Sequence, residues 1–359
     1  MKRILGVVVA LLLLDLLLLL WPGRSGPTPP RAAGDHPRAR VGLVFDVGGR
    51  GDKSFNDAAY AGLVRAREEL GVEVEYIEPG EGADRESALR IFASRGFALI
   101  FGVGFIFTDD LTELAREYPQ THFAGIDYAL QLDDQGRVIP PPANVAALKF
   151  REEEGSCLVG ALAGLVSRTG RVGFVGGMDI PLIRRFEAGY RAGVREVCPA
   201  CTVTANYAGV TGTAFKDPGK GKELALSQYR SDVDVIFHAS GSTGLGVFEA
   251  ARLTGKLAIG VDGDQYAEAP GHVLTSMIKR VDVTVLEIVR ETVEGRFRGG
   301  VREFGLAEQG VGYVLDERNR ALIPEAAERQ VEELRRRILA GELRVPTRPE
   351  TTPTSREAP

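Results

Sequence analysis

The sequence has few of the residues that bind metal ions or carry out covalent catalysis. Its 359 residues include three cysteines and four histidines. The histidines stand at positions 36, 122, 238 and 272, and no two of them have the close spacing of zinc ligands. The chain also lacks the Gly-x-Ser-x-Gly segment that presents the nucleophile in many hydrolases. We therefore expect no enzyme activity, no metal site and no bound cofactor.

An excess of positive charge is also absent. The chain carries 44 basic and 49 acidic residues, for a net charge of −5. Proteins that bind nucleic acids need a basic surface, so nucleic acid is not an expected partner. Aromatic residues make up only 7% of the chain, whereas glycine occurs 44 times. Frequent glycine suits the turns at strand ends of α/β proteins, and the length suits two lobes better than one core.

The few cysteines allow more than one interpretation. Cys198 and Cys201 form a Cys-Pro-Ala-Cys segment. In the cytosol this spacing would suit a redox pair or a metal site, but zinc would need two further ligands and no second such pair exists. In an oxidising compartment a local structural disulfide is the simpler interpretation. Cys157 lies in an apolar helical pattern and is predicted to be a buried, unreactive thiol.

The N-terminus combines a basic start with a long apolar run. Lys2 and Arg3 precede residues 4–20, which are apolar apart from Asp15. This pattern predicts a secretory signal peptide or a signal anchor over residues 1–21, with the rest of the chain exported. An aspartate at a bilayer centre costs about 2.5–3.5 kcal/mol, and no small-x-small cleavage site follows the run, so cleavage stays open. A periplasmic or other extracytoplasmic location is expected in either case.

Two further segments have compositions that cannot build a core. Residues 22–40 are rich in proline, arginine, glycine and alanine, which predicts a linker. Residues 344–359 are mostly proline, threonine, arginine and glutamate, which predicts a disordered tail.

Between these segments, predicted strands alternate with predicted helices. Strands are expected over residues 41–46, 72–77, 98–101, 121–126, 144–149, 171–175, 202–207, 233–237, 257–261 and 273–276, with two short ones near 302–314. Helices are expected over residues 54–70, 85–94, 108–118, 152–167, 183–197, 220–230, 243–253, 283–294 and 325–340.

This alternation predicts an α/β fold with mostly parallel sheets that are covered by helices on both faces. The series runs twice, and the last part of the chain has to be shared between the two halves. We therefore predict two Rossmann-like lobes joined by several chain crossings. Lobe 1 is assigned residues 41–148 and about 277–310, and lobe 2 is assigned residues 149–276 and about 311–343.

In open α/β sheets, ligands bind beyond the carboxyl ends of the strands. The residues that follow the predicted strands are Asp46, Gly102, Asp127, Gly176, Phe215, Gly241, Asp262 and Lys279. Acidic residues recur in this set. Carboxylates accept hydrogen bonds and repel anions, so the set favours a ligand rich in hydrogen-bond donors over a phosphate.

Three segments stand out, and each also has a purely structural explanation. In residues 45–57, Asp52 or Ser54 can cap the next helix, which leaves Phe55 and Asn56 in its first turn. Residues 235–246 have GxxGxG spacing instead of GxGxxG, which predicts a tight turn and not a nicotinamide site. In the third segment, Asp262 lies at the end of a predicted strand and Lys279 lies shortly after the next one. Both could reach a cleft, or they could act as a cap and a solvated charge.

Taken together, these segments resemble the basic membrane protein (BMP) family of ABC-transporter substrate-binding proteins, which includes purine nucleoside receptors. The resemblance covers roughly residues 41–315. It is carried by Asp46-x-Gly-x-x-x-Asp52-Lys-Ser-Phe-Asn-Asp57, Tyr118-Pro, Phe123-Ala-Gly-Ile-Asp127, Phe150-Arg-Glu-Glu-Glu-Gly155, Leu158-Val-Gly-Ala, Gly173-Phe-Val-Gly-Gly177, Phe215-Lys-Asp-Pro-Gly-Lys220, Gly260-Val-Asp262 and Ser276-x-x-Lys279. The Asp-Lys-Ser-Phe-Asn segment is the most specific of these motifs.

The resemblance implies a periplasmic-binding-protein type I fold, in which two lobes close about a hinge on a nucleoside. Phe55 and Phe215 would stack on the two faces of the base. The polar edges of the base would meet Asp46, Asn56 and Asp127, and the ribose would meet Asp262, Lys279 and the backbone at Gly241. The expected partner is an ABC permease in the membrane, with the receptor acting as a monomer.

The sequence departs from the family pattern in two ways. Many family members are lipoproteins with a cysteine just after the signal, but here no cysteine precedes Cys157. We therefore expect no N-terminal lipid, and a protein that is free or held by an uncleaved N-terminal helix. The polar Ser240 and Ser242 near His238 leave the preferred base open.

Other functions remain alternatives at this stage. A receptor of the same fold could take another flat heterocycle, such as a flavin. A ligand-sensing regulator of transcription would need a DNA-binding head, which residues 1–40 do not supply. A nucleoside hydrolase could use clustered aspartates to bind calcium or to activate water, and we expect no such activity.

Overall fold

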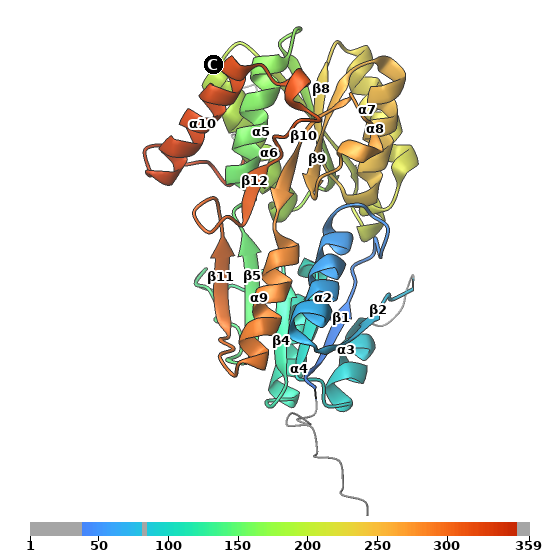
Figure 1. The fold of residues 1–359 in the computed structure, drawn as a ribbon, viewed down its shortest axis with the longest axis vertical. Helices are drawn as coiled ribbons and strands as arrows, with labels where there is room; N and C mark the ends of the chain where they lie inside the picture. The colour runs from blue at the N-terminus through green and yellow to red at the C-terminus, as the bar shows by residue number, and fades with distance from the viewer. Residues whose placement is uncertain (1–37, 81–84, 350–359) are drawn as a thin grey trace, which may run out of the picture. The chain divides into compact units, whose positions relative to one another are not determined.

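The structure, a computed structural model, describes residues 38–80 and 85–349. The predicted signal segment 1–21, nearly all of the predicted linker 22–40 and most of the predicted tail 344–359 lie outside the described residues. Among the helices that are described, none has the length and apolar character needed to cross a bilayer. The chain from Ala39 onward forms one unit that contains two α/β lobes (Figure 1).

Lobe 1 is built on a parallel six-stranded sheet. Its strands lie in the order β11 (Gly300–Phe304), β5 (Val145–Phe150), β4 (His122–Ile126), β3 (Leu99–Val103), β1 (Arg40–Val44) and β2 (Glu73–Ile77). Helices α2 (Phe55–Leu70) and α9 (Val281–Val293) pack on one face, and α3 (Arg85–Ser94) and α4 (Thr108–Glu117) pack on the other. Because both faces are covered, Leu43 and its neighbour Val44 are both buried, each in a different core.

Lobe 2 repeats this plan with one antiparallel edge strand. The order is β12 (Val311–Tyr313), β10 (Val273–Lys279), β9 (Leu257–Asp262), β8 (Val235–Ala239), β6 (Arg171–Met178) and β7 (Thr202–Gly209), and β12 alone runs against its neighbour in this sheet. One face carries α5 (Glu152–Val166), α6 (Pro181–Val197) and α10 (Glu325–Leu339), and the other carries α7 (Pro218–Arg230) and α8 (Gly244–Thr254).

Helices α5 and α6 approach each other unusually closely. A Cβ atom at Gly193 would lie 1.9 Å from the carbonyl oxygen of Cys157, and one at Gly160 would lie 2.2 Å from the carbonyl oxygen of Tyr190. Any side chain at these positions would therefore force the helices apart. This close approach brings the start of α5 next to Arg185 of α6, which matters for the charge network described below.

Local signals set several helix boundaries, of which the end of α2 was predicted, whereas α7 begins two residues before its predicted start at residue 220. Helix α2 ends at Gly71, whose φ of 68° is left-handed and suits glycine. Helix α7 starts at Pro218, and the Asp217 carboxylate before it accepts a hydrogen bond from the backbone N–H of Lys220 at 2.8 Å.

The end of α6 carries the one disulfide of the described residues. Cys198 and Cys201 are bonded to each other, as the export interpretation of the sequence expects. Cys157 is a free thiol inside lobe 2, and burial raises its pKa to about 12, so it stays protonated and unreactive.

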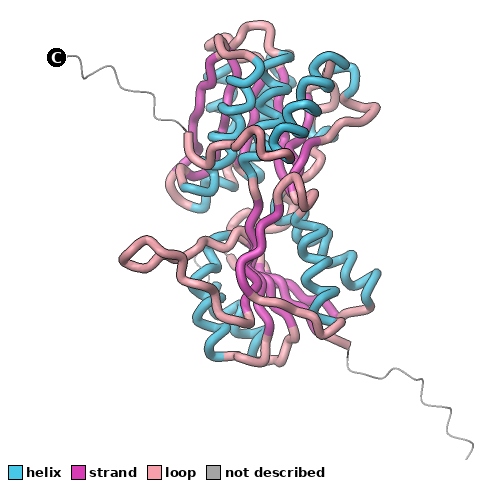
Figure 2. The backbone as a smooth tube through the Cα atoms, turned by 90° about the vertical axis from the view of Figure 1, so that its left-hand side faces the viewer, coloured by secondary structure: helices cyan, strands magenta, loops and turns pink. Residues whose placement is uncertain are grey.

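The chain passes between the lobes at three places, between β5 and α5, between β10 and α9, and between β11 and β12 (Figures 1 and 2). Residues 277–279, which were predicted for lobe 1, belong to β10 and therefore to the sheet of lobe 2. The crossings are tied to one another by backbone hydrogen bonds, from Arg151 N–H to Phe304 O at 3.0 Å and from Arg280 N–H to Gly310 O at 2.8 Å. They form a single hinge region.

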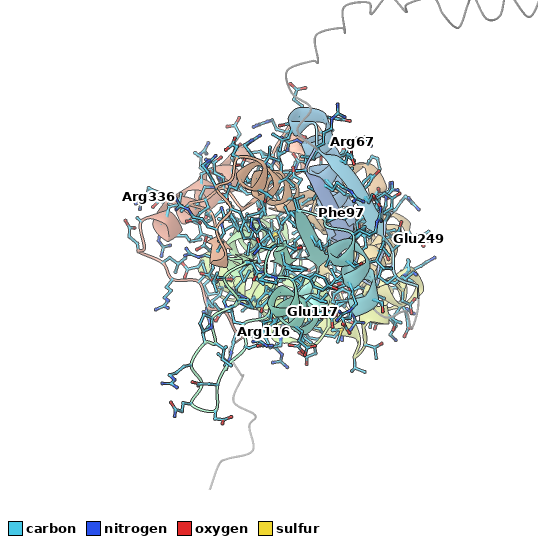
Figure 3. All side chains as sticks on the ribbon, turned by 90° about the horizontal axis from the view of Figure 1, so that it is seen from below. Arg67, Phe97, Arg116, Glu117, Glu249 and Arg336 are labelled. Atoms are coloured by element: carbon cyan, nitrogen blue, oxygen red, sulfur yellow. A yellow bond between two sulfur atoms is a disulfide. The ribbon has the colours of Figure 1, made fainter. Side chains whose placement is uncertain are left out.

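The end of lobe 1 that faces away from lobe 2 is polar. Figure 3 looks onto this end, where Arg67, Arg116 and Glu117 are exposed at the ends of α2 and α4. Phe97, in contrast, is buried against Phe92, with the Arg40 guanidinium 4.1 Å above the centre of its ring.

Candidate ligand-binding site

A cavity lies where the carboxyl ends of the two sheets face each other. It has about 590 Å³ of space that protein atoms do not fill, part of it open to solvent. All eight residues that the sequence predicts for ligand binding line it, namely Asp46, Phe55, Asn56, Asp127, Phe215, Gly241, Asp262 and Lys279. They come from both lobes, so the cavity exists only where the lobes meet.

The loop after β1 is organised by Asp52. Its carboxylate accepts hydrogen bonds from the backbone N–H groups of Ser54, Asn56 and Asp57, at 2.9 to 3.1 Å, and so caps α2. The Asn56 side chain donates to Asp52 at 3.0 Å and accepts from the N–H of Asp46 at 3.1 Å. Asn56 therefore lines the cavity as part of a fixed loop, with one amide hydrogen left for a ligand.

Asp46 is a partly buried carboxylate just after β1. Burial raises its pKa to about 6, although the hydrogen bond from Val47 N–H and the charge of Arg85 partly oppose this. The turn after β3 approaches it closely, because a Cβ atom at Gly104 would lie 2.5 Å from Asp46 Oδ2. Gly104 also has a φ of 104°, which only glycine adopts without strain. Glycine at this position therefore keeps Asp46 at the cavity wall.

Two further acids end equivalent strands of the two lobes. Asp127 follows β4 with a φ of 59°, and Asp262 ends β9 with a φ of 66°, so both have left-handed backbones. The Asp262 carboxylate accepts a hydrogen bond from Ser54 Oγ of lobe 1. Burial raises the pKa of Asp262 to about 6, against the lowering effects of Lys279 and of the Ser54 hydrogen bond.

Lys279 is the cation of the cavity. Its Nζ lies 2.6 and 2.7 Å from the two carboxylate oxygens of Asp127 and 3.2 Å from Oε1 of Glu152. Three phenylalanine rings surround it, with centres 4.9 to 5.6 Å from Nζ, from Phe55, Phe150 and Phe186. Burial alone would lower the pKa of Lys279, but the carboxylates of Asp127, Glu152 and Asp262 together outweigh it and raise the pKa, so the side chain stays charged.

The aromatic walls come from both lobes. Phe55 is the first residue of α2, and Phe215 closes the short helix η2 (Gly212–Phe215) after β7. Phe215 lies against the backbone of β6, since a Cβ atom at Gly177 would be 2.2 Å from its ring. A flat ring bound in the cavity would therefore meet an aromatic side chain from each lobe.

The sequence did not single out several residues that build this site. Phe186 lines the cavity from α6, where helical spacing gave no sign of a ligand contact. Gln265 accepts hydrogen bonds from Val261 N–H at 2.8 Å and pairs with His238 Nε2 at 3.1 Å. Burial lowers the pKa of His238 to about 4, so the ring is neutral at pH 7 and acts as a support below the cavity.

Side chains also link the two lobes directly. Lys279 of β10 pairs with Asp127 of lobe 1, Ser54 of lobe 1 donates to Asp262 of lobe 2, and Gln265 of lobe 2 donates to the carbonyl oxygen of Lys53 at 3.0 Å. The structure is therefore a closed arrangement of the lobes.

Within residues 38–80 and 85–349, no group of three or more His, Cys, Asp or Glu side chains is arranged to hold a metal ion. The site is suited to binding a flat, polar molecule.

Comparison with known proteins agrees with this arrangement. The family model of PnrA-like ABC transporter substrate-binding proteins, Bmp, matches residues 39–348. The chain is 36% identical over 331 residues to the CD4+ T-cell-stimulating antigen of Listeria innocua, which covers 86% of this chain and 88% of that protein. It is 30% identical over 331 residues to the ABC transporter nucleoside-binding protein BmpA of Lactococcus lactis, with 86% and 89% covered.

The fold has a counterpart among solved structures. An ABC transporter solute-binding protein from Aeropyrum pernix superimposes with a TM-score of 0.78 at 33% identity, over 87% of this chain and 94% of that one. The predicted periplasmic-binding-protein type I fold is thereby confirmed, with two parallel-sheet α/β lobes. The chain belongs to the Bmp family of PnrA-like ABC transporter substrate-binding proteins.

Proposed function

We propose that this protein captures a nucleoside, with a purine base, between its two lobes and delivers it to an ABC permease. The observation that carries the proposal is the composition of the cavity, which combines aromatic side chains from both lobes with carboxylates at the strand ends. A similar protein of Lactococcus lactis is described as nucleoside-binding, which supports the same ligand class.

The aromatic side chains account for affinity to a base. Phe55 approaches the cavity from lobe 1 and Phe215 from lobe 2. Stacking of a base on an aromatic ring contributes about 1–3 kcal/mol, and every base offers two such faces. We propose that the two rings hold the base between them. Stacking discriminates weakly, so the choice of base has to come from polar contacts.

The polar side chains account for orientation. We propose that Asp46, Asn56 and Asp127 meet the edge of the base. Asp46 lies just after β1, and its backbone N–H is bonded to Asn56, which follows Phe55 at the start of α2. A carboxylate accepts hydrogen bonds only, so a base that offers N–H donors along its edge fits this set.

On the other side of the cavity, we propose that Asp262 accepts from the two vicinal hydroxyls of the ribose. Lys279 and the backbone at Gly241 would add donors to the sugar oxygens. Gly241 has a φ of 56° and begins the short helix η3 (Gly241–Thr243), so its backbone lies at the cavity wall without a side chain in the way. A 5′-phosphate would meet several carboxylates against one ammonium, so the site favours nucleosides over nucleotides.

Delivery needs a location outside the cytoplasm. We propose that the protein works as an exported monomer, free or held by its N-terminal segment, and that it docks on the permease with its lobes closed. The disulfide between Cys198 and Cys201 supports export, because such bonds form and persist in oxidising compartments.

The direct test is to identify the bound ligand. Protein purified from its native host is denatured, and the released molecules are analysed by mass spectrometry. Calorimetry with guanosine, inosine, adenosine, cytidine and riboflavin then ranks the candidates. A co-purifying purine nucleoside that binds tightly supports the proposal. Tight binding of riboflavin with no binding of any nucleoside would overturn the ligand and keep the receptor.

A further inference from the structure

Glu152 is a buried charge that the ligand site does not itself use. It is the first residue of α5, is only 1% exposed, and does not line the cavity. Neither of its carboxylate oxygens accepts a well-aligned hydrogen bond from the described residues. A buried carboxylate without hydrogen bonds destabilises the folded protein unless neighbouring charges compensate for it. The charged groups nearest to Glu152 must therefore stabilise it.

Those charges form an alternating chain that leads out of the cavity. Asp127 pairs with Lys279, Lys279 lies 3.2 Å from Glu152, and Glu152 lies 3.6 Å from Nε of Arg185. Arg185 in turn makes two hydrogen bonds of 2.9 Å with Glu153. Each charge in the chain therefore has neighbours of the opposite sign, and Arg185 is held in place by Glu153 while it also faces Glu152.

The titration of Glu152 reflects these neighbours. Burial raises the pKa of the carboxyl to about 7, the charges of Lys279 and Arg185 lower it, and Asp127 raises it. The positive charge of Lys279 therefore favours the ionised form of Glu152.

The contacts of the Lys279 ammonium indicate what Glu152 does. Nζ lies 2.6 and 2.7 Å from the two oxygens of Asp127 and forms an ion pair with Oε1 of Glu152 at 3.2 Å. Three phenylalanine rings also lie around Nζ. The negative charges of Asp127 and Glu152 together therefore hold the ammonium at the cavity wall.

The two carboxylates differ in which lobe they belong to. Asp127 is in lobe 1 and separates from Lys279 when the lobes open. Glu152 starts a helix that packs on the same sheet as β10, so it stays beside Lys279 in either state. We propose that Glu152 is a positioning residue, which holds the Lys279 ammonium at the cavity wall from within lobe 2, where the ammonium can meet the ligand. The inference rests on the nucleoside-binding function proposed above and adds a residue to that site.

The chain offers a matched control. Glu153 is the next residue, is also buried, and shares Arg185, but it has no contact with Lys279. In calorimetry with guanosine, E152Q is expected to bind about tenfold more weakly than wild type, whereas E153Q should stay within about twofold. Equal losses in the two variants, or no loss in E152Q, would overturn the positioning role.

A second readout separates positioning from a general loss of structure. If Lys279 contacts the ribose, wild type and E153Q will prefer guanosine over 2′-deoxyguanosine or 3′-deoxyguanosine. In E152Q this preference should become smaller as the affinity falls, because the ammonium is no longer held at the sugar, while the part that Asp262 contributes should remain. A merely loosened protein would lose affinity for all three compounds equally and keep the ratio, and that outcome contradicts the proposal.

If the nucleoside proposal is wrong, wild type will bind none of these compounds. That outcome differs from a failure of the positioning role, in which wild type still binds guanosine. Urea unfolding of ligand-free wild type, E152Q, K279M and the double variant tests the contact in that case. Effects that are clearly non-additive support a role of Glu152 through Lys279, and additive effects overturn it.

Discussion

The two lobes present an acid at the same point of each sheet, but they compensate its charge differently. Asp127 of lobe 1 and Asp262 of lobe 2 both end a strand with a left-handed backbone. Asp127 is paired with the ammonium of Lys279, whereas Asp262 receives a hydroxyl hydrogen bond from Ser54. Asp127 is thus neutralised by a full positive charge, whereas Asp262 is compensated by the dipole of the Ser54 hydroxyl together with the more distant Lys279.

In both cases the partner comes from the opposite lobe. Lys279 ends the strand β10 of lobe 2, and Ser54 precedes the helix α2 of lobe 1. Both acids are therefore fully compensated only while the lobes are closed. Closure of the lobes therefore also stabilises the buried charges of Asp127 and Asp262.

The largest effect is expected from removing the cation of lobe 2. Lys279→Met leaves Asp127 and Glu152 buried without it, and breaking a buried ion pair on one side costs about 3–5 kcal/mol of unfolding free energy. Nucleoside binding should be lost as well. Urea unfolding followed by circular dichroism measures the first effect, and calorimetry measures the second. An unfolding free energy equal to that of wild type would show that Lys279 does not compensate these acids.

The next largest effect distinguishes the role of Asp262 from that of Asp127. Asp262→Ala is expected to weaken nucleoside binding about tenfold or more, because hydrogen bonds to a charged acceptor contribute about 1.5–3 kcal/mol. The fold should stay intact, since burial already disfavours the charge of Asp262 in the free protein. Asp127→Asn should lower the unfolding free energy more than Asp262→Ala does, because it removes the closest partner of Lys279. Unchanged titration heats for Asp262→Ala would exclude its ribose contact.

A smaller effect is expected from pH. Asp46 and Asp262 have pKa values raised by burial from 3.8 to about 6. Each holds its proton more tightly when folded, so its contribution to stability is full below pH 3.8 and is lost as the pH rises to about 6. Nucleoside affinity should change in the opposite direction and rise as the pH passes about 6, because only the carboxylates accept from the ligand's donors.

Unfolding and calorimetry across this pH range check both trends. The double variant Asp46→Asn, Asp262→Asn should flatten the two profiles. Affinity that falls as the pH rises would mean that these acids bind the ligand in their protonated form.

The smallest effect on binding is expected from the disulfide, which belongs to lobe 2. Replacing Cys198 and Cys201 by serine opens a very short loop and should cost about 2 kcal/mol of stability or less. The disulfide lies at the C-terminal end of α6, away from the carboxyl ends of the strands that line the cavity. Nucleoside affinity should therefore stay within about twofold of wild type. A much larger loss of affinity would show that α6, which carries Phe186 and Arg185, depends on this bond.

Much of this architecture follows from sequence patterns. Apolar runs of strand length that alternate with helical periodicity predict two parallel-sheet lobes, because each strand is buried on both faces and each helix on one. Six of the eight predicted site residues were found because they follow predicted strands, and Phe55 and Asn56 were found in the segment that starts the first helix. The structure places all eight at one cavity. Their individual ligand contacts remain predictions.

Other features could not be predicted, because they depend on contacts between distant segments. Gln265 links the lobes through Lys53, more than two hundred residues away in sequence. Phe186 has the spacing of any buried helical residue, and only the packing of α6 turns it toward the cavity. The extent of β10 through Lys279 also depends on pairing with β9 and β12.

The sequence by itself determined the alternation of strands and helices, the glycines that allow close approach, and the acids that follow the strands. These are local properties, set by side-chain periodicity and backbone conformation. Only the tertiary structure decided which of these acids share a cation. The charge of Asp127 is compensated by a lysine 152 positions later, and the free energy of that pair depends on distance and burial, which the order of residues does not specify.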